Sequence, residues 1–115
     1  MDSQKTNANV MKCDVSNIWK VLGKAWSLLI LKNLSTKESI RFNELKKLLP
    51  EISNTVLADR LRELESEKLI MKKIYAQVPL KVEYSLTKDA KDLEIVLEEL
   101  ERWIKKRESV TKNKK

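Results

Sequence analysis

Apolar side chains recur at intervals of three and four residues along most of the chain, which is the period of an amphipathic helix. This spacing predicts helices over residues 14–22, 25–34, 43–49, 53–67 and 87–107. Gly23 is expected to end the first helix in the left-handed conformation, and Pro50 stops the third. The hydroxyls of Ser53 and Thr87 are suited to accept from the free N–H groups that begin the fourth and last helices.

The period changes from helical to alternating between residues 69 and 86. Residues 69–76 and 82–86 alternate apolar and polar side chains, and a loop containing Pro79 separates them, which predicts a β-hairpin. Residues 39–41 suit a minimal strand. The resulting order of elements is that of a winged helix-turn-helix, an α+β fold that is mainly α and here ends in a long C-terminal helix for dimerisation. The recognition helix is then residues 53–67 and the wing is residues 70–86.

The predicted core lies on the inner faces of these helices. Helix 25–34 is apolar almost all round, so we place it in the middle of the domain. Trp19 and Trp26 are expected in the core rather than in contact with a ligand. The inward side chains of the next two helices are expected to be Leu45, Leu48, Leu49, Leu57, Leu61 and Leu64.

Composition excludes most enzyme chemistry. The 115 residues allow one small domain, and they include no His, one Cys and one Gly. Most zinc sites, histidine general bases, Ser-His or Cys-His pairs and glycine-rich phosphate loops are therefore excluded. We expect no enzyme activity, no metal and no cofactor, and carboxylate-only hydrolysis is the weakest of the remaining functions.

The charge balance favours a polyanion as partner. The formal net charge is +7, which attracts nucleic acid, although such a charge can also serve solubility alone. The longest apolar run, residues 28–31, is far shorter than the ~20 residues that span a bilayer. We expect a cytoplasmic protein without membrane contact, with a flexible arm over residues 1–12, a domain over residues 13–107 and a basic tail over residues 108–115.

The recognition helix offers side chains that can read the edge of a base. Asn54 can pair with adenine, Arg62 can meet guanine or a phosphate, and Asp59 can accept from cytosine or pair with an arginine. The alternative is that the charged residues of this helix only solvate a surface, through pairs three and four residues apart. The side chains opposite its leucines are Ser53, Asn54, Thr55, Ala58, Asp59 and Arg62.

Further polar and cationic residues are candidates for contacts with the DNA backbone. They are Lys24, Ser27, Arg41, Asn43, Lys72, Lys73 and Lys81. We expect the lysines of the hairpin to position the protein rather than to read bases; the alternative is that they protect a sheet edge from aggregation. A dimer with ~6–10 phosphate contacts should lose about 10³–10⁵-fold in affinity between about 50 and 200 mM salt.

The last helix carries more apolar surface than its own domain can cover. Its stripe recurs every seven residues, and Trp103 would be exposed in a monomer. We expect a homodimer that presents two recognition helices ~34 Å apart to a near-palindrome; the alternative is a monomer whose last helix folds back on the domain. The predicted interface residues are Leu93, Val96, Leu97, Leu100, Trp103 and Ile104, with Val15, Ile18 and Trp19 of the first helix.

Six parts of the chain together resemble the HxlR-type family of winged-helix transcriptional regulators, relatives of the MarR proteins. They are Cys13 and residues 22–31 (LGKAWSLLIL), 41–45 (RFNEL), 52–57 (ISNTVL), 60–64 (RLREL) and 82–87 (VEYSLT). The resemblance implies a homodimer that pairs through its terminal helices and binds operator DNA. Several members of the family sense oxidants or electrophiles through an N-terminal cysteine. The chain departs from the family pattern at Asp14, Asp59, Lys81 and the wing dipeptide Pro79-Leu80.

Cys13 is the candidate redox sensor. Lys12 precedes it and a predicted helix begins just after it, an environment that favours the reactive thiolate. With one cysteine in the chain, a disulfide would join Cys13 to another molecule; the alternative is a small buried residue without reactivity. The effector of the regulator can therefore be an oxidant or a small molecule.

The sequence thus predicts a transcriptional regulator that binds double-stranded DNA as a homodimer through its recognition helix and wing. Two alternatives remain, namely a winged-helix module that binds protein and an architectural DNA-binding protein without an operator.

Overall fold

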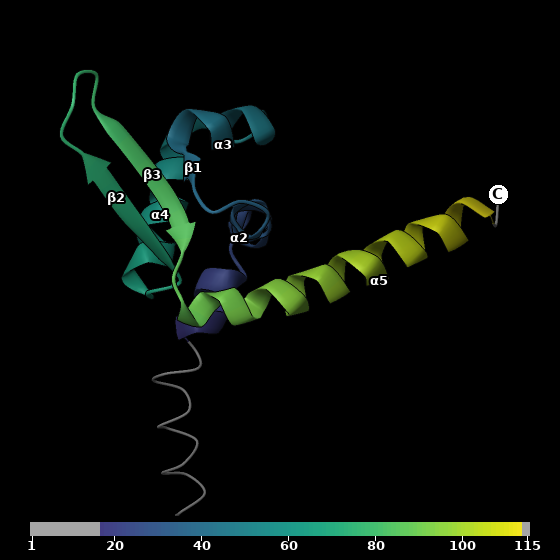
Figure 1. The fold of residues 1–115 in the computed structure, drawn as a ribbon. Helices are drawn as coiled ribbons and strands as arrows, with labels where there is room; N and C mark the ends of the chain where they lie inside the picture. Colours follow the sequence, from purple (N-terminus) through teal and green to yellow (C-terminus); the bar gives the residue numbers. More distant parts are fainter. Residues whose placement is uncertain (1–16, 114–115) are drawn as a thin grey trace, which may run out of the picture.

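The structure is a computed structural model, and it describes residues 17–113. Helical residues 17–22 come first (Figure 1). The elements that follow are α2 (Ser27–Ser35), β1 (Ile40–Arg41), α3 (Phe42–Leu48), α4 (Asn54–Ser66), β2 (Ile70–Tyr75), β3 (Lys81–Leu86), the 3-10 helix η1 (Asp89–Asp92) and α5 (Leu93–Asn113). This order confirms the predicted winged helix-turn-helix. The predicted arm, Cys13 and Val15 lie outside the described residues.

The three strands form one antiparallel sheet in the order β1-β3-β2. Ile70 pairs with Leu86 and Lys72 with Tyr84, in the register that the alternation predicted. The short strand β1 pairs with the edge of β3 that faces away from β2, and Ile40 lies opposite Tyr84 there. Paired residues share a face of the sheet, so the buried side chains of Ile40, Ile70 and Leu86 all face the helices.

The core is built where α2, α3, α4 and the inner face of the sheet meet. α4 contributes Leu57, Leu61 and Leu64, all buried, as the spacing predicted. α2 contributes a stripe at the same spacing, namely Ser27, Ile30, Leu31 and Leu34. The prediction for Leu48 was wrong, because Leu45 and Leu49 point inward one turn apart and leave Leu48 facing solvent.

The segment of residues 23–26, here called the connector, differs from the prediction. α2 begins at Ser27 instead of residue 25, and the left-handed residue is Trp26, with φ 79°, rather than Gly23. Gly23 still closes the first helix, since its N–H donates to the Trp19 carbonyl at 2.8 Å. A Cβ at position 23 would lie 3.1 Å from that same oxygen, a tight contact that a larger residue could make only if the backbone shifted slightly. Trp26 packs partly buried against the core, as predicted, whereas Trp19 is 69% exposed.

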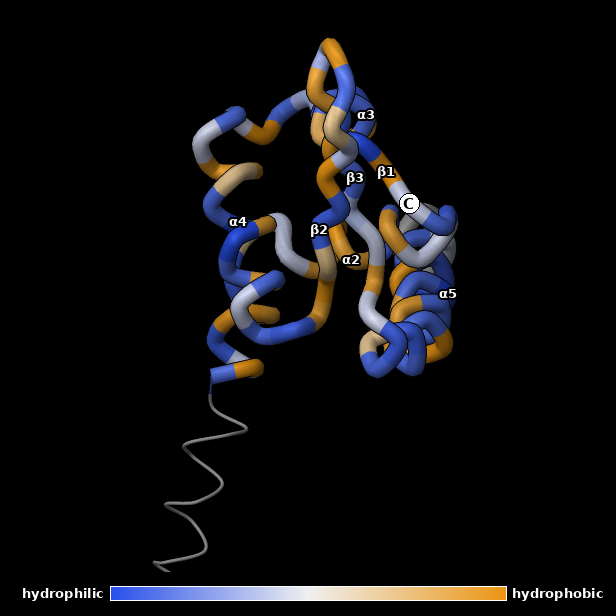
Figure 2. Tube along the Cα trace, turned by 60° about the vertical axis from the view of Figure 1, so that its left-hand side comes forward, coloured by the Kyte–Doolittle hydropathy of each residue, from blue (hydrophilic) through white to orange (hydrophobic). Residues whose placement is uncertain are grey.

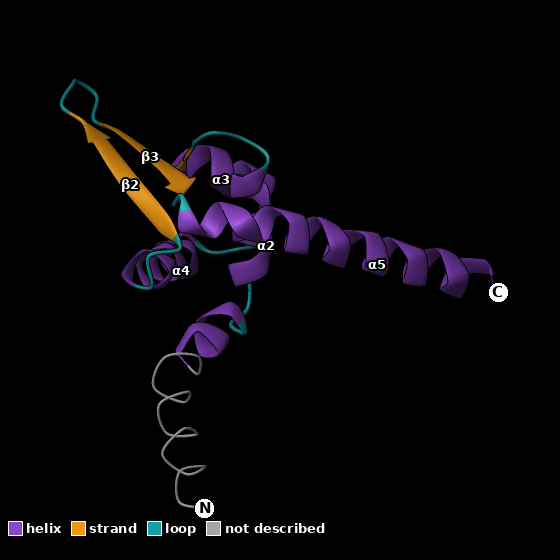
Figure 3. Ribbon diagram, turned by 60° about the horizontal axis from the view of Figure 1, so that its bottom comes forward, coloured by secondary structure: helices purple, strands orange, loops and turns teal. Residues whose placement is uncertain are grey.

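The last helix both begins and ends later than predicted, because residues 89–92 form the 3-10 helix η1 and α5 itself starts at Leu93. The Thr87 hydroxyl accepts from the Ala90 N–H at 3.2 Å, which caps the 3-10 turn that precedes α5. α5 continues to Asn113 instead of ending near residue 107, so most of the predicted basic tail is helical. Figures 1 and 3 both show α5 running outward, with its C-terminal half beyond the rest of the described chain.

Candidate nucleic-acid interface

The outer side of α4 is a polar surface at the edge of the domain. Ser53 caps the helix, because its Oγ accepts from the Val56 N–H at 3.1 Å. Asn54 and Thr55 are exposed in the first turn, beside backbone N–H groups that have no partner within the helix. Ala58 and the largely exposed Arg62 continue this side. The structure therefore brings the predicted base-reading residues together on one face.

Asp59 and Arg62 form an ion pair one turn apart on this face. The Arg62 guanidinium donates to the Asp59 carboxylate. Of the partners that the sequence suggests for Asp59, a cytosine or an arginine, the structure therefore shows an arginine. The pair is solvent-exposed, so it contributes little to stability. It does hold the Arg62 side chain along the surface of α4, where its remaining donors stay accessible.

Two predicted backbone contacts are placed differently by the structure. Ser27 is fully buried, because it lies on the inner stripe of α2, and its Oγ has no hydrogen-bond partner among the described residues. It cannot reach a phosphate from this position, so that prediction was wrong. Lys24 is exposed but its ammonium lies 2.7 Å from the Glu63 carboxylate of α4.

Arg60 has a structural role that the sequence did not reveal. Its Nε donates to the Ala25 carbonyl at 2.8 Å, and its Nη1 lies 3.4 Å from the Glu63 carboxylate. The pair with Glu63 was expected from the spacing of three residues. The bond to Ala25 joins segments 35 residues apart, and such a contact leaves no local signal in the sequence.

The outer face of the wing carries a cluster around Tyr75. The Lys73 and Lys81 ammonium groups lie 5.1 Å and 4.6 Å from the centre of the Tyr75 ring, within range of a cation–π contact. The Tyr75 hydroxyl donates to the Glu83 carboxylate at 3.0 Å, and Lys81 pairs with the same carboxylate at 3.4 Å. These contacts connect the two strands of the wing and bring two cations together.

The pKa of Glu83 reflects this cluster. Desolvation of the carboxyl raises its pKa, but hydrogen bonds from Tyr75 and Lys81 and the charge of Lys81 together outweigh that effect, with a further bond from Ser39. The pKa of Glu83 therefore lies below its ordinary value, and the carboxylate is charged at neutral pH. It screens Lys81 in part, while Lys73 has its ring contact and an open side toward solvent.

The remaining predicted backbone contacts are exposed. Arg41 of β1 lies opposite Glu83 of β3, which in turn lies opposite Lys73 of β2, so the three share one face of the sheet. Asn43 is exposed in the first turn of α3, and the Arg41 N–H donates to Glu44 at the start of that helix. Lys72 is exposed on the other face, in the row of Tyr84.

The tip of the wing is apolar, in contrast to its sides. Val78 is 99% exposed and Leu80 is 66% exposed. Figure 2 shows an orange, hydrophobic stretch at the end of the wing, above strands in which hydrophobic and hydrophilic positions are mixed. The charge of the wing is thus carried by the strands, at Lys72, Lys73 and Lys81, and not by its end.

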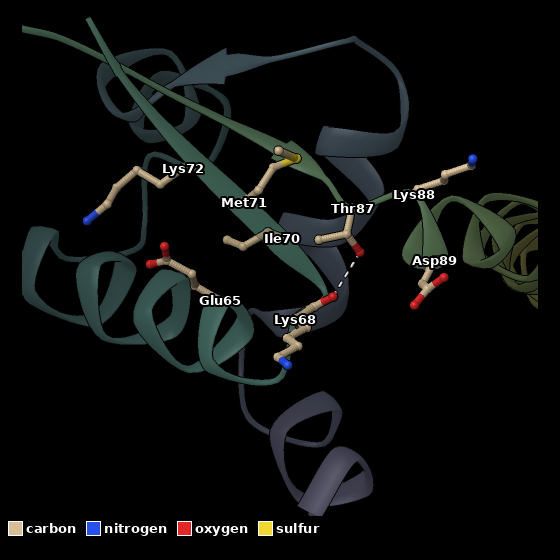
Figure 4. A pocket seen from close by; sticks show the side chains of 8 residues that line it. All are labelled: Glu65, Lys68, Ile70, Met71, Lys72, Thr87, Lys88 and Asp89. Atoms are coloured by element: carbon tan, nitrogen blue, oxygen red, sulfur yellow. Dashed lines mark hydrogen bonds between the residues drawn. The ribbon is translucent and has the colours of Figure 1, made fainter. Parts of the chain in front are cut away.

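A surface hollow of about 470 Å³ lies at the C-terminal end of α4 (Figure 4). Glu65 and Lys68 line it from α4 and the turn after it, and Thr87 lines it from the start of the last helix. The Thr87 hydroxyl donates to the Lys68 carbonyl at 2.8 Å, and its N–H donates to Leu69 at 3.1 Å. These bonds attach the end of α4 to the segment that leads into α5.

Of the predicted dimer residues that the structure describes, six are exposed and two, Leu93 and Leu97, pack against the core of their own chain. Val96, Leu100, Trp103 and Ile104, here called the α5 stripe, range from 37% to 57% exposed. Ile18 and Trp19 are also exposed. Leu97 is buried in the core of its own chain and Leu93 packs against that core, which leaves little of Leu97 for a partner.

A groove of about 430 Å³ lies between α2 and α5 beside this stripe. Leu28, Leu29, Leu100 and Ile104 are among its lining residues. Lys32 of α2 pairs with Glu101 of α5 at 3.1 Å, and this hydrogen bond is the main reason that the pKa of Glu101 lies below its ordinary value. The ion pair joins α5 to α2 at this groove, which both residues line.

Two further observations concern sites that the described chain does not offer. Residues 17–113 contain no cluster of three or more Cys, Asp or Glu side chains that could hold a metal ion. Within that same part of the chain, the helices are too short or too polar to cross a membrane.

Comparisons with known proteins agree with this geometry. A family model described as HxlR-like helix-turn-helix matches residues 21–112. The HTH-type transcriptional regulator YdeP of Bacillus subtilis is 40% identical over 91 residues, which cover 79% of this chain and 70% of YdeP. The HTH-type transcriptional regulator YodB of the same organism is 34% identical over 95 residues, which cover 83% of this chain and 84% of YodB. The reduced form of the redox regulator HypR superposes with a TM-score of 0.77 at 31% identity, covering 86% of this chain and 97% of HypR.

Proposed function

The chain belongs to the HxlR-like helix-turn-helix family, and from this premise we propose that it is a transcriptional regulator that binds an operator in double-stranded DNA as a homodimer. YdeP and YodB are both named as transcriptional regulators, and HypR is described as a redox regulator. These names describe regulators and not enzymes.

The exposed polar side of α4 is the observation that carries the proposal. An α-helix fits the major groove, and α4 presents Asn54, Thr55 and Arg62 on the side away from its buried leucines. Its N-terminal N–H groups favour a phosphate or a base acceptor near Ser53. Arg62 reads guanine or a phosphate with the donors that Asp59 does not occupy. The base-reading residues therefore lie on one exposed side of a helix whose other side is fixed in the core.

The wing positions the protein on the backbone. Lys72 and Lys73 are exposed on opposite faces of β2 and can reach phosphates on either side of a groove. Lys81 is held by Glu83 and by the Tyr75 ring, so it adds charge at a fixed place. Lysine is a point charge and does not impose the two-pronged geometry that arginine does. The wing therefore contributes to the affinity for DNA and to the orientation of the protein on it, rather than to the choice of sequence.

Dimerisation follows from the α5 stripe. Trp103 is 56% exposed and lies with Val96, Leu100 and Ile104 on one helix that extends beyond the domain. Contiguous apolar surface of this kind is typical of an interface between copies. A twofold pair of such chains presents two recognition helices to two half-sites, as a near-palindromic operator requires.

Selection of duplexes from a random-sequence pool tests the proposal. The protein should enrich a near-palindrome and bind it ~10³-fold or more above a scrambled duplex of equal length. Joint replacement of Asn54, Thr55 and Arg62 by Ala should remove that preference. Salt-dependent binding without preference would identify an architectural protein instead. A protein-binding module would show neither preference nor salt-dependent binding.

We further propose that Cys13 makes the regulator responsive to oxidants. Support comes from the description of HypR as a redox regulator and from Cys13 being the single cysteine of the chain. Treatment with diamide should change operator affinity in the wild type and leave that of Cys13→Ser unchanged. An equal response of both proteins would contradict this role.

A further inference from the structure

A network of charged side chains joins α4 to the connector, residues 23–26. The Lys24 ammonium lies 2.7 Å from Glu63 Oε2, and Arg60 Nη1 lies 3.4 Å from Glu63 Oε1. Arg60 Nε donates to the Ala25 carbonyl at 2.8 Å. Two neighbouring residues of the connector are therefore bound by two residues one turn apart on α4.

The network is partly shielded from solvent. The side chains of Arg60 and Glu63 are 19% and 29% exposed, below the 45% and 65% of Asp59 and Arg62 on the outer side of α4, while that of Lys24 is 44% exposed. Partial burial strengthens such contacts and lowers their sensitivity to salt. The same helix thus has one exposed ion pair on its outer side and one sheltered network on its flank.

The connector itself is held in a fixed shape. The Gly23 N–H bonds to the Trp19 carbonyl at 2.8 Å, and the Ser27 N–H bonds to the Lys24 carbonyl at 3.2 Å. Trp26 adopts φ 79°, a left-handed conformation that a tryptophan enters only when its surroundings require it. These contacts restrict the backbone between the helix of residues 17–22 and α2.

The connector lies between two surfaces that act together in the proposed function. On one side is the helix of residues 17–22, whose exposed Ile18 and Trp19 are assigned to the dimer interface. On the other side is α4, which enters the DNA. The buried leucines of α4 all lie on one side and set its depth in the domain. Arg60 and Glu63 hold the flank of α4 and oppose rotation of the helix about its row of buried leucines.

We propose that Lys24, Arg60 and Glu63 are positioning residues that set the orientation of the recognition helix relative to the N-terminal helix. In the dimer this orientation fixes the spacing of the two recognition helices, and hence the operator that is preferred. The inference rests on the proposed function. In this inference Lys24 acts through its ion pair with Glu63 and does not contact a DNA phosphate.

Two single variants separate positioning from charge. Lys24→Met removes a positive charge and Glu63→Gln removes a negative one, so electrostatics alone predicts opposite changes in DNA affinity. A positioning role predicts the same change in both, which is a lower ratio of affinity for the selected operator over a scrambled duplex. We expect this ratio to fall about 3- to 10-fold in each variant, which corresponds to a small rearrangement of the base contacts.

Two further proteins serve as controls. Lys91→Met removes the same charge from an exposed lysine that forms no ion pair among the described residues, and it should leave the ratio unchanged. The conservative variant Lys24→Arg keeps a cation within reach of Glu63 and leaves the Arg60–Glu63 contact in place, so it should hold the ratio at its wild-type value. Melting temperatures of all variants should stay above the assay temperature, since an ion pair of this exposure contributes little to global stability.

The outcomes decide between the roles of Lys24. A fall of the ratio in Lys24→Met and Glu63→Gln, with the wild-type ratio in Lys24→Arg, supports the network. If Lys24→Met instead weakens both duplexes equally and lowers the salt slope by about one, Lys24 contacts a phosphate and the inference is wrong. An unchanged ratio in both single variants also overturns it. A wild type that prefers no sequence contradicts the proposed function itself, which is a different result from any of these.

Discussion

α4 and α5 are both amphipathic helices, but their apolar sides are covered in different ways. α4 buries Leu57, Leu61 and Leu64 within its own domain. Among its described side chains, α5 buries only Leu97, and it leaves Val96, Leu100, Trp103 and Ile104 exposed. One helix is complete in a single chain and the other is not. The comparison shows that an apolar stripe predicts burial, while the fold decides whether the same chain or a second one covers it.

The polar sides of the two helices differ as well. α4 turns exposed polar groups outward at its N-terminus, where free N–H groups add to their ability to bind DNA. α5 carries internal ion pairs on its outer surface, such as Arg102 with Glu99 and Lys105 with Glu101. Pairs of this kind solvate a helix and satisfy its charges locally. In the proposed function the two helices therefore have different roles, α4 binding DNA and α5 joining two copies of the chain.

Removing a core leucine of α4 should have the largest effect on stability. Leu57→Ala deletes a fully buried side chain and leaves a cavity, so the free energy of unfolding should fall by about 2–5 kcal/mol. Chemical denaturation followed by circular dichroism measures the change. Thr55→Ala, two residues away on the exposed side, should change it by less than about 0.5 kcal/mol. Similar losses from both would contradict the division of α4 into a buried and an exposed side.

Removing the tryptophan of α5 should affect assembly rather than folding. Trp103→Ala should weaken the dimer by about 2 kcal/mol, or about 30-fold in dissociation constant, because a partly exposed tryptophan in an apolar surface is a typical centre of binding energy. Analytical ultracentrifugation measures this constant. Arg102→Ala, whose exposed side chain pairs within α5, is the matched control. Equal dissociation constants for Trp103→Ala and the wild type would remove the α5 stripe from the interface.

Arg62 and Lys72 should separate base reading from backbone contact. Arg62→Ala should cost about 1–3 kcal/mol on the selected operator and relax its sequence preference. Lys72→Ala should weaken selected and scrambled duplexes alike and lower the salt slope by about one. Titration of both duplexes at several salt concentrations measures these effects. Ser27→Ala should leave both affinities unchanged, since Ser27 is buried. Equal and sequence-blind losses for Arg62 and Lys72 would contradict the assigned roles.

Protonation of Glu83 should have the smallest effect, confined to acidic pH. Because hydrogen bonds and the charge of Lys81 hold its pKa below the ordinary value, despite the opposing effect of desolvation, the folded state favours the charged carboxylate. The resulting stability is present above the ordinary pKa and is lost as pH falls through the lowered pKa. The melting temperatures of the wild type and Glu83→Gln should therefore converge on acidification. A difference that grows as pH falls would contradict the sign.

The features of the fold that depend on local pattern could be predicted from the sequence. The leucine spacing of α4, its Ser53 cap, the register of the wing and the family itself are all confirmed. Each depends on residues within a few positions of one another or on a pattern that extends along the chain. The exposed positions of Asn54, Thr55 and Arg62 follow from the same spacing.

The features that depend on distant contacts could not be predicted. Lys24 pairs with a residue 39 positions away, and its sequence neighbourhood looks the same whether it meets Glu63 or a phosphate. Ser27 is polar but falls on the inner stripe of α2, because the helix begins at residue 27 after the left-handed Trp26. The end of α5 at Asn113 was missed since charged residues continue a helix as readily as they form a tail.

Methylation protection of the selected operator tests the central claim most directly, namely that the exposed side of α4 enters the major groove twice per dimer. Guanine N7 lies in that groove, so bound protein should shield guanines in two clusters whose centres are about 10–10.5 base pairs apart or a multiple of that spacing. A single protected cluster, or an operator bound tightly with its major-groove guanines fully reactive, would contradict the account.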